Sequence, residues 1–377
     1  MHPTPLAHRS RRSAALIAVL LALLALLAPA AAGTPAAQAK GKPIYWGAQI
    51  GRQFTGQQPP WDMHALKAFQ KRTKKGLSLL AFYAPFADCT TGKHCQMNGF
   101  PTDQMEKIRD YGAIPFLSWS SASTAENPKK QPEFRLSKII HGRYDSYIRE
   151  WAEASREWGH PYFLRYDWEM NGFWFPWNEG VNGNHAGEFV KAWRHVHDIF
   201  SEVKANNATW VWCPNIALIP SLKHFGDLYP GPRYVDWTCL DGFNWGNTPN
   251  SAGWQSFTHV FSSTYKEVMK IAPSKPMVLG EVASDERGGS KAKWIKNALA
   301  AIPEKFPKIR GLVWFDERSQ GMKWPIESSK SSERAFQKAI ASKLYKPNIY
   351  SRLLGPKIAP PTFGPPPSEP PEAKPAA

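Results

Sequence analysis

Two glutamates in this chain, Glu169 and Glu281, each follow an apolar stretch of the kind that forms a buried β-strand. Two carboxyl groups that face each other across a cleft can break a glycosidic bond, with one as the proton donor and the other as the nucleophile. A dense aromatic run follows the first glutamate, at Phe173, Trp174, Phe175 and Trp177. Flat aromatic rings pack against the apolar faces of sugars, so the pattern favours a site that cleaves polysaccharides.

The segments that must position these glutamates alternate between strand-like and helix-like from residue 43 to about residue 318. Strands are predicted at residues 44–49, 77–83, 114–119, 162–169, 209–214, 235–244, 277–282 and 312–316. Helices are predicted at residues 63–74, 102–111, 144–158, 185–205, 256–271 and 291–306, with a closing helix at 331–345. This order predicts an α/β fold, a (β/α)8 TIM barrel that forms a single catalytic domain. A doubly wound open sheet is the alternative, but no glycine-rich dinucleotide turn follows the first strand.

A barrel brings both glutamates to one end of the fold, where the carboxyl ends of its strands meet. Glu169 ends the fourth predicted strand, and Glu281 ends the seventh. Strand alternation places Arg165, Asp167 and Glu169 on one face, towards the barrel interior. We therefore expect Arg165 and Asp167 to form a supporting ion pair beneath Glu169.

Each glutamate also has a simpler interpretation. A carboxylate at the end of a strand often only caps the next helix, and this applies to Glu169. Packing explains Glu281 poorly, because it follows an apolar run and Gly280 leaves room beside it. The joint position of the two residues favours a catalytic pair.

Aromatic and amide side chains near the predicted strand ends are candidates for substrate binding. The aromatic candidates are Trp46, Trp119, Trp174, Trp177, Trp212, Trp245 and Trp314. The amide candidates for binding sugar hydroxyls are Asn171, Asn215 and Asn244. Core packing is the competing role for the tryptophans, since 17 of them cannot all line one cleft.

The two ends of the chain differ in composition from its centre. Three arginines precede an apolar run of 15 residues and a set of small residues, which predicts a secretory signal peptide at residues 1–39. A membrane anchor is the alternative, but the run is short for a span of about 20 residues. Residues 40–348 are predicted to form the catalytic domain, and residues 349–377 a Pro-rich disordered tail.

The charge of the chain is strongly basic. Loss of residues 1–39 removes three arginines and no acid, which lowers the net charge from +16 to +13. The basic residues are scattered, so we expect a soluble secreted monomer without nucleic-acid binding or stable membrane insertion. Adhesion to an anionic wall polysaccharide is the alternative.

Four cysteines in an exported chain predict disulfide bonds. Cys89 and Cys95 share one polar loop and are expected to pair. Cys213 and Cys239 lie on predicted neighbouring strands, where they either pair or stay as buried thiols. The sequence contains no Cys-x-x-Cys pattern, and we expect neither a metal nor a cofactor.

Several motifs resemble glycoside hydrolase family 26. Residues 168–177, Trp-Glu-Met-Asn-Gly-Phe-Trp-Phe-Pro-Trp, are similar to the family's acid/base motif, which usually begins with His. Residues 276–281 resemble its nucleophile strand. Residues 229–242 resemble the approach to its sixth strand, and residues 311–316 resemble the eighth strand of the wider clan. The resemblance covers about residues 43–345.

The resemblance implies a retaining mechanism and a set of roles. Glu169 is expected to act as the general acid and then as the general base, with a raised pKa, and Glu281 as the nucleophile. Their carboxyl groups should lie about 5–5.5 Å apart. The expected sugar contacts come from Trp119, Trp174, Trp177, Trp245 and Trp314, with Asn171 and Asn244.

Two residues depart from the family pattern. Trp168 stands where the family has His. Phe243 matches the position of a clan tyrosine that binds the nucleophile, so Tyr83 or Asn244 would have to replace its hydroxyl. The expected activity is that of a secreted, retaining, endo-acting β-1,4-mannanase-like glycosidase. A β-1,3/1,4-glucanase or xylanase of the same fold is an alternative, and a non-catalytic polysaccharide-binding barrel is an alternative of another class.

Overall fold

The computed structural model describes residues 41–89, 95–124, 127, 129–217, 225–249 and 251–368. The predicted signal peptide and residues 369–377 of the predicted tail lie outside these residues. Among the described residues, no helix is both long and apolar enough to span a membrane.

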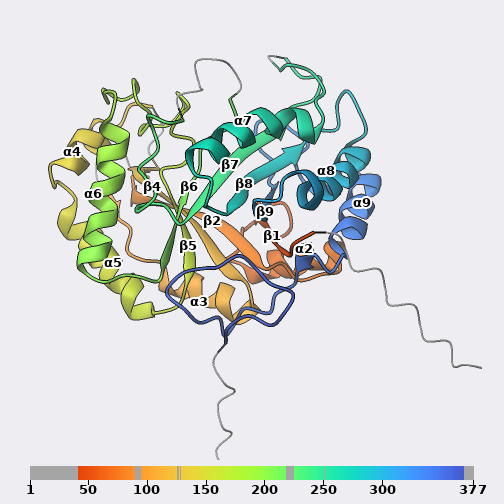
Figure 1. The fold of residues 1–377 in the computed structure, drawn as a ribbon, viewed down its shortest axis with the longest axis horizontal. Coiled ribbons are helices and arrows are strands. Elements are labelled where there is room, and N and C mark those ends of the chain that lie inside the picture. Colours follow the sequence, from red (N-terminus) through yellow and green to blue (C-terminus); the bar gives the residue numbers. More distant parts are fainter. Residues whose placement is uncertain are drawn as a thin grey trace, which may run out of the picture. The chain divides into compact units, whose positions relative to one another are not determined.

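Eight parallel strands form a closed barrel, as predicted (Figure 1). They pair in the order β1, β2, β4, β5, β6, β7, β8 and β9, and β9 pairs again with β1. Their bounds are β1 Ile44–Ile50, β2 Leu79–Asp88, β4 Ile114–Ser123, β5 Tyr162–Tyr166, β6 Ala208–Trp212, β7 Trp237–Asn244, β8 Met277–Ser284 and β9 Ile309–Asp316. Two short strands, β3 Gln96–Met97 and β10 Tyr345–Lys346, extend the sheet beside β2 and β1. The barrel strands are buried on both faces, which explains why they read as continuous apolar runs.

Helices surround the barrel (Figure 1). Their bounds are α2 Met63–Thr73, α3 Thr102–Tyr111, α4 Leu136–Ile140, α5 Asp145–Trp158, α6 Glu188–Glu202, α7 Phe257–Ile271, α8 Lys291–Lys305 and α9 Lys330–Ile340. Several begin at a side chain that accepts a backbone N–H, such as Asp62 before α2 and Ser256 before α7. The described part of the connection from β6 to β7 contains no α-helix.

The core lies in two layers, inside the barrel and between the barrel and its helices. Large aromatic side chains fill the outer layer: the ring of Trp119 on β4 stacks on Trp151 of α5, with centroids 4.3 Å apart. Trp314 on β9 packs against Phe336 of α9 with a centroid distance of 5.2 Å. Many of the 17 tryptophans therefore hold helices onto strands rather than facing solvent.

Residues 349–368 lie against the amino ends of the strands, where the composition predicted a disordered tail. Ile358 is buried and its carbonyl oxygen accepts the indole N–H of Trp237 at 2.8 Å. The hydroxyl of Tyr45 donates to the carbonyl oxygen of Ala359 at 2.9 Å. The segment therefore covers the barrel end opposite to the two glutamates, while the predicted domain boundaries stay predictions.

Candidate active site

Glu169 lies just beyond the end of β5, in a strained backbone. β5 ends at Tyr166, and both Asp167 and Glu169 have positive φ angles, 39° and 53°. Such angles are uncommon outside glycine and are often found at functional sites. The N–H of Glu169 donates to the Cys213 carbonyl oxygen at 2.7 Å, and its own carbonyl accepts the Asn178 amide at 2.9 Å. These bonds fix the backbone that aims the Glu169 carboxyl.

Glu281 lies within β8 and is preceded by a glycine for a steric reason. A Cβ atom at Gly280 would lie 2.6 Å from both the Asp241 carboxylate and the Cys239 sulfur. Only glycine allows β8 to approach the neighbouring β7 residues this closely, which brings Glu281 over the barrel interior.

The predicted pair of carboxyl groups meets. One carboxylate oxygen each from Glu169, Asp241 and Glu281 lies within 4.8 Å of the others. This separation suits a retaining glycosidase, whose two carboxyl groups lie about 5–5.5 Å apart, and leaves less room than an inverting mechanism needs. Three acids this close could also hold a metal ion, but Arg165 already donates to two of them.

Arg165 is the buried cation of this cluster. Its guanidinium donates to Asp241 Oδ2 and to Glu281 Oε1, each at 2.8 Å, and to the Ser118 hydroxyl. Although burial acts to lower the pKa of Arg165, the carboxylates of Asp241 and Glu281 raise it above its ordinary value. The cation therefore stays charged beneath Glu281.

The predicted ion pair between Arg165 and Asp167 is wrong. Asp167 instead accepts the backbone N–H and the hydroxyl of Ser121, at 2.7 and 2.6 Å. The strand ends at Tyr166 and the left-handed turn at Asp167 rotates its side chain away, so strand alternation no longer applies. Asp167 ties the end of β5 to β4.

Among the described residues, only neutral groups donate to the carboxyl of Glu169. Asn215 Nδ2 donates to one oxygen and the Trp174 indole N–H to the other, both at 2.6 Å. Burial raises the pKa of Glu169 to about 7, and the nearby Glu281 carboxylate adds to the rise, while the two hydrogen bonds oppose it. A carboxyl group with this pKa keeps its proton up to neutral pH.

A cleft of about 820 Å³ opens over the two glutamates. The residues that line it come from the carboxyl ends of β2, β4, β7, β8 and β9 and from the loops that follow strands. They are Tyr83, Pro85, Ser120, Thr124, Trp168, Glu169, Trp174, Phe175, Asn215, Phe243, Trp245, Glu281, Phe315, Ser319, Gln320 and Trp324. Of the residues predicted to contact the sugar, Trp174, Trp245 and Asn215 are among them.

Three predicted contacts point the other way. Trp119, Asn244 and Trp314 are fully buried, and none of them lines the cleft. Their strand neighbours Ser120, Phe243 and Phe315 line it instead, because successive side chains of a strand face opposite sides. Each prediction chose the right strand end but the wrong face, and Trp46 and Trp212 are likewise buried away from the cleft.

Two further predicted contacts support the site from behind. Trp177 stacks on Phe175 with a centroid distance of 4.4 Å, and its indole N–H donates to the Trp168 carbonyl. Asn171 accepts the backbone N–H of Asn215 at 2.8 Å and so fixes a residue that binds Glu169. Neither lines the cleft.

Comparison with known proteins shows which family this site resembles. The model of glycosyl hydrolase family 26 matches residues 119–298, a range that includes both glutamates. The predicted resemblance to glycoside hydrolase family 26 is confirmed.

Two curated relatives match part of the chain. Endoglucanase H of Acetivibrio thermocellus is 35% identical over 242 residues, which are 63% of this chain and 25% of that protein. Beta-1,3-xylanase TXYA of a Vibrio species is 27% identical over 130 residues, which are 32% of this chain and 26% of that protein. The matched segments thus span about a quarter of the length of these relatives.

Solved structures share the fold. The catalytic domain of the family 26 endo-β-1,4-mannanase from Bacillus sp. JAMB-750 superposes with a TM-score of 0.60 at 16% identity, over 83% of this chain and 91% of that one. The family 26 domain of a Prevotella bryantii endo-β-mannanase/endo-β-glucanase gives a TM-score of 0.57 at 15% identity.

The first departure from the family 26 pattern places an indole in the cleft. Trp168 lines the cleft, and its ring lies 4.9 Å from the Arg165 guanidinium and 5.3 Å from the Tyr83 ring. It thereby packs against the two side chains that bind Glu281. The imidazole expected from the family motif is replaced by an apolar wall.

The second departure is compensated by another strand. Phe243 lines the cleft without a hydroxyl, and Tyr83 on β2 donates its hydroxyl to Glu281 Oε1 at 2.7 Å. Of the two replacements considered from the sequence, Tyr83 is therefore correct. Asn244 bonds instead to the Ser284 hydroxyl.

Sequence reasoning missed Asp241 and Trp324. Asp241 lies within β7, where a buried acid in an apolar run was a signal that could have been used. Trp324 lies in the loop after β9, where no periodicity marks it.

The four cysteines form two disulfides. The predicted Cys89–Cys95 bond is confirmed, and Cys213 and Cys239 are also bonded. The second bond joins the end of β6 to β7 beside Asp241, and so lies under the cleft.

Proposed function

We propose that this protein is a secreted, retaining β-glycanase that cleaves within a β-linked polysaccharide. The observation that carries the proposal is the pair of buried carboxyl groups within 4.8 Å: Arg165 donates to one, and among the described residues only neutral groups donate to the other. The apolar cleft above them, with the partly exposed rings of Trp174 and Trp245, suits a pyranose ring.

Glu281 is the nucleophile in this proposal. Its Oε1 accepts hydrogen bonds from Arg165 and Tyr83, and no described residue donates to Oε2. Oε2 attacks the anomeric carbon as the glycosidic C–O bond breaks, and the proton of Glu169 passes to the departing oxygen. This step leaves a glycosyl ester on Glu281 and an ionised Glu169.

Glu169 then acts as the general base. It takes a proton from water as the water oxygen attacks the anomeric carbon, and the ester bond to Glu281 breaks. The second inversion restores the starting β configuration, the free Glu281 carboxylate and the protonated Glu169. A pKa of about 7 suits a group that must both give and take a proton.

The first substrate candidate is β-1,4-mannan, the substrate class of the solved family 26 structures by name. A second candidate is a β-1,3/1,4-glucan or a xylan. It is favoured by Trp168 in place of the family's His and by the names of the two curated relatives.

The test is hydrolysis of a panel of mannans, mixed-linkage glucans and β-1,3- and β-1,4-xylans by the wild-type protein, Glu169→Ala and Glu281→Ala. Glu157→Ala is the matched control, since this side chain is largely exposed. We expect new reducing ends from one glycan class, first formed in the β configuration, and a loss of about 10⁴-fold or more in kcat/KM for Glu281→Ala. Binding without reducing ends would support the non-catalytic barrel instead.

Azide distinguishes the two roles on an aryl glycoside with a good leaving group. Glu169→Ala should form its glycosyl-enzyme without acid assistance and give the β-glycosyl azide. Glu281→Ala should give the α-glycosyl azide by a single displacement. The reverse pairing of products would contradict the assigned roles.

A further inference from the structure

One wall of the cleft is an irregular loop held by buried charged side chains. The loop runs from residue 317 to residue 329, between β9 and α9, and its Trp324 lines the cleft. The Trp324 ring packs against Phe243 and Trp245, with centroid distances of 4.9 and 5.1 Å. These three aromatic rings form a continuous wall, in which Phe243 and Trp245 are partly exposed and Trp324 is buried behind them.

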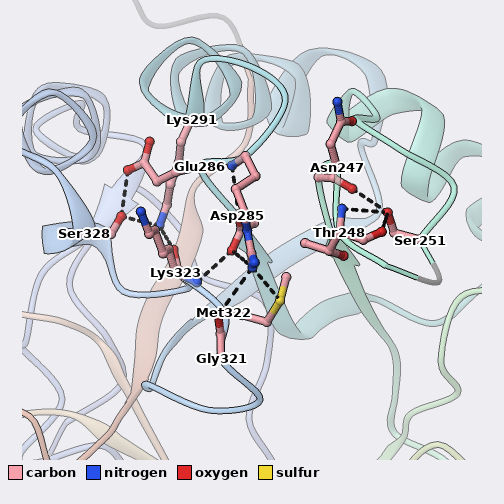
Figure 2. Close-up of polar contacts among 12 residues, drawn as sticks. Asn247, Thr248, Ser251, Asp285, Glu286, Lys291, Gly321, Met322, Lys323 and Ser328 are labelled. Carbon is pink, nitrogen blue, oxygen red and sulfur yellow. Dashed lines mark hydrogen bonds and ion pairs between the residues drawn. The ribbon is translucent and has the colours of Figure 1, made fainter.

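Lys291 holds the backbone of this loop (Figure 2). The three N–H groups of its ammonium are shared among four acceptors within hydrogen-bond distance: the consecutive carbonyl oxygens of Lys323, Trp324 and Pro325, and the Ser328 hydroxyl. The Trp324 carbonyl oxygen also accepts the indole N–H of Trp314 at 3.1 Å. Trp314, which was predicted to contact the sugar, thus holds the backbone of Trp324, a residue that lines the cleft.

The position of Lys291 breaks two rules of local stability. It is the first residue of α8, where the helix dipole disfavours a cation, and it is fully buried. Burial lowers the pKa of Lys291 to about 8, although Glu286, Asp316, Glu327 and Asp285 oppose that effect. Residues that break local rules are expected where function requires them.

Asp285 holds the same loop from the end of β8. Its carboxylate accepts the backbone N–H of Lys323 at 2.7 Å and two N–H groups of Arg287 at 2.7 and 2.9 Å. Arg287 donates in turn to the Met322 sulfur, and its carbonyl oxygen accepts the N–H of Asn247. The turn after the Glu281 strand therefore joins the loop that carries Trp324 to the loop that follows Trp245.

We infer that Lys291 and Asp285 are positioning residues of the sugar site, which fix the Trp324–Trp245 wall and thereby set the affinity for the glycan. The inference rests on the proposed function. The wall packs on the substrate before and during the reaction, so its loosening weakens ground state and transition state alike. Substrate affinity therefore changes while the chemical step does not.

The test uses Lys291→Met, which keeps the length of the side chain and removes its ammonium. We expect the backbone amides of residues 322–328 to exchange with solvent at least about tenfold faster in the ligand-free protein. With the glycan that the wild type cleaves, we expect KM to rise about tenfold and kcat to change less than about twofold. Lys293→Met is the matched control, because Lys293 is exposed on the same helix turn and should change neither quantity.

Ser328→Ala is a milder variant if Lys291→Met fails to fold. It removes one acceptor of Lys291 and the hydroxyl that donates to Glu286 at 2.7 Å, so the same changes should be smaller. In Lys291→Ala, added propylammonium supplies the missing ammonium and should lower KM, whereas tetramethylammonium, which has no N–H, should not.

Unchanged exchange in residues 322–328 overturns the inference, whether or not any glycan is cleaved. A fall in kcat at constant KM, or equal effects of the two cations, also overturns it. Inactivity of the wild type on every glycan counts against the proposed function, and amide exchange then decides on the positioning role alone.

Discussion

The two carboxyl groups of the cleft differ in their surroundings although they lie within 4.8 Å of each other. Glu281 receives a charged donor, Arg165, and the Tyr83 hydroxyl. Glu169 receives, from the described part of the chain, only the neutral N–H groups of Asn215 and Trp174. A single cation placed on one side makes two chemically identical groups unequal, which is how one site can hold an acid and a nucleophile at the same pH.

Removal of the cation should have the largest effect on this difference. Arg165→Met leaves Asp241 and Glu281 as buried acids without a partner, so we expect the free energy of unfolding at pH 7 to fall by about 3–5 kcal/mol. Urea denaturation measures the loss. Arg149→Met removes an exposed arginine that pairs with Glu202 and should change stability far less. Equal losses of stability in the two variants would mean that Arg165 does not stabilise the buried Asp241 and Glu281.

Neutralising the other carboxyl should have the opposite sign. The pKa of Glu169 is raised from an ordinary value of 4.5 to about 7. Its protonated form therefore contributes stability that is complete below pH 4.5 and is lost as the pH rises through 7. Glu169→Gln keeps a neutral side chain at every pH but turns an NH2 group towards one of the two N–H donors, Asn215 or Trp174, at a cost that does not depend on pH. Relative to the wild type, its unfolding free energy should therefore rise by on the order of 3 kcal/mol from acid pH to a pH above 7.

The same variant carries its own control. At pH 4 the wild-type carboxyl is protonated as well, so the difference in unfolding free energy there reports the lost acceptor alone. A difference of the same size at pH 4 and above pH 7 would show that burial does not raise the pKa of Glu169.

The elements around the two glutamates could be predicted because parallel barrel strands are buried on both faces and read as apolar runs. All eight strands lie where the sequence placed them, and Glu281 follows from its strand. Glu169 was found by its motif. The positive φ angles at Asp167 and Glu169 could not be predicted from the alternation of residues along the strand.

Side-chain direction at the strand ends could not be predicted in the same way. A shift of one residue moves a side chain from the cleft to the helix layer, and composition does not separate the two in a barrel where both layers are apolar. Trp314 and its cleft-facing neighbour Phe315 are both aromatic, so residue type does not show which of them faces the cleft. Trp324 escaped notice because buried side chains, rather than any repeating pattern, hold its loop.

The neutral donor on Glu281 should matter less than the cation. Tyr83→Phe removes one hydrogen bond to Oε1 and keeps Arg165 in place. A hydrogen bond to a charged group contributes about 1.5–3 kcal/mol, so we expect kcat/KM to fall about 10- to 100-fold without loss of the fold. Tyr147→Phe is the matched control, since the hydroxyl of Tyr147 donates to the Asn98 carbonyl oxygen and not to Glu281. A fall of similar size in the control would remove Tyr83 from the site.

The smallest change should appear as a shift in pH dependence. A general acid must be protonated, so kcat/KM should fall as the pH rises through about 7, the pKa of Glu169. The Trp174 indole N–H stabilises the ionised carboxylate, and Trp174→Phe removes that bond while keeping an aromatic ring in the cleft. The pKa of Glu169 should then rise, and the alkaline limb of the profile should move up by about one pH unit. Trp177→Phe loses an N–H that donates to a backbone carbonyl instead, so its limb should stay in place. A limb that moves down in Trp174→Phe would mean that another group titrates there, and the contrast between the two glutamates would then lie in Arg165 alone.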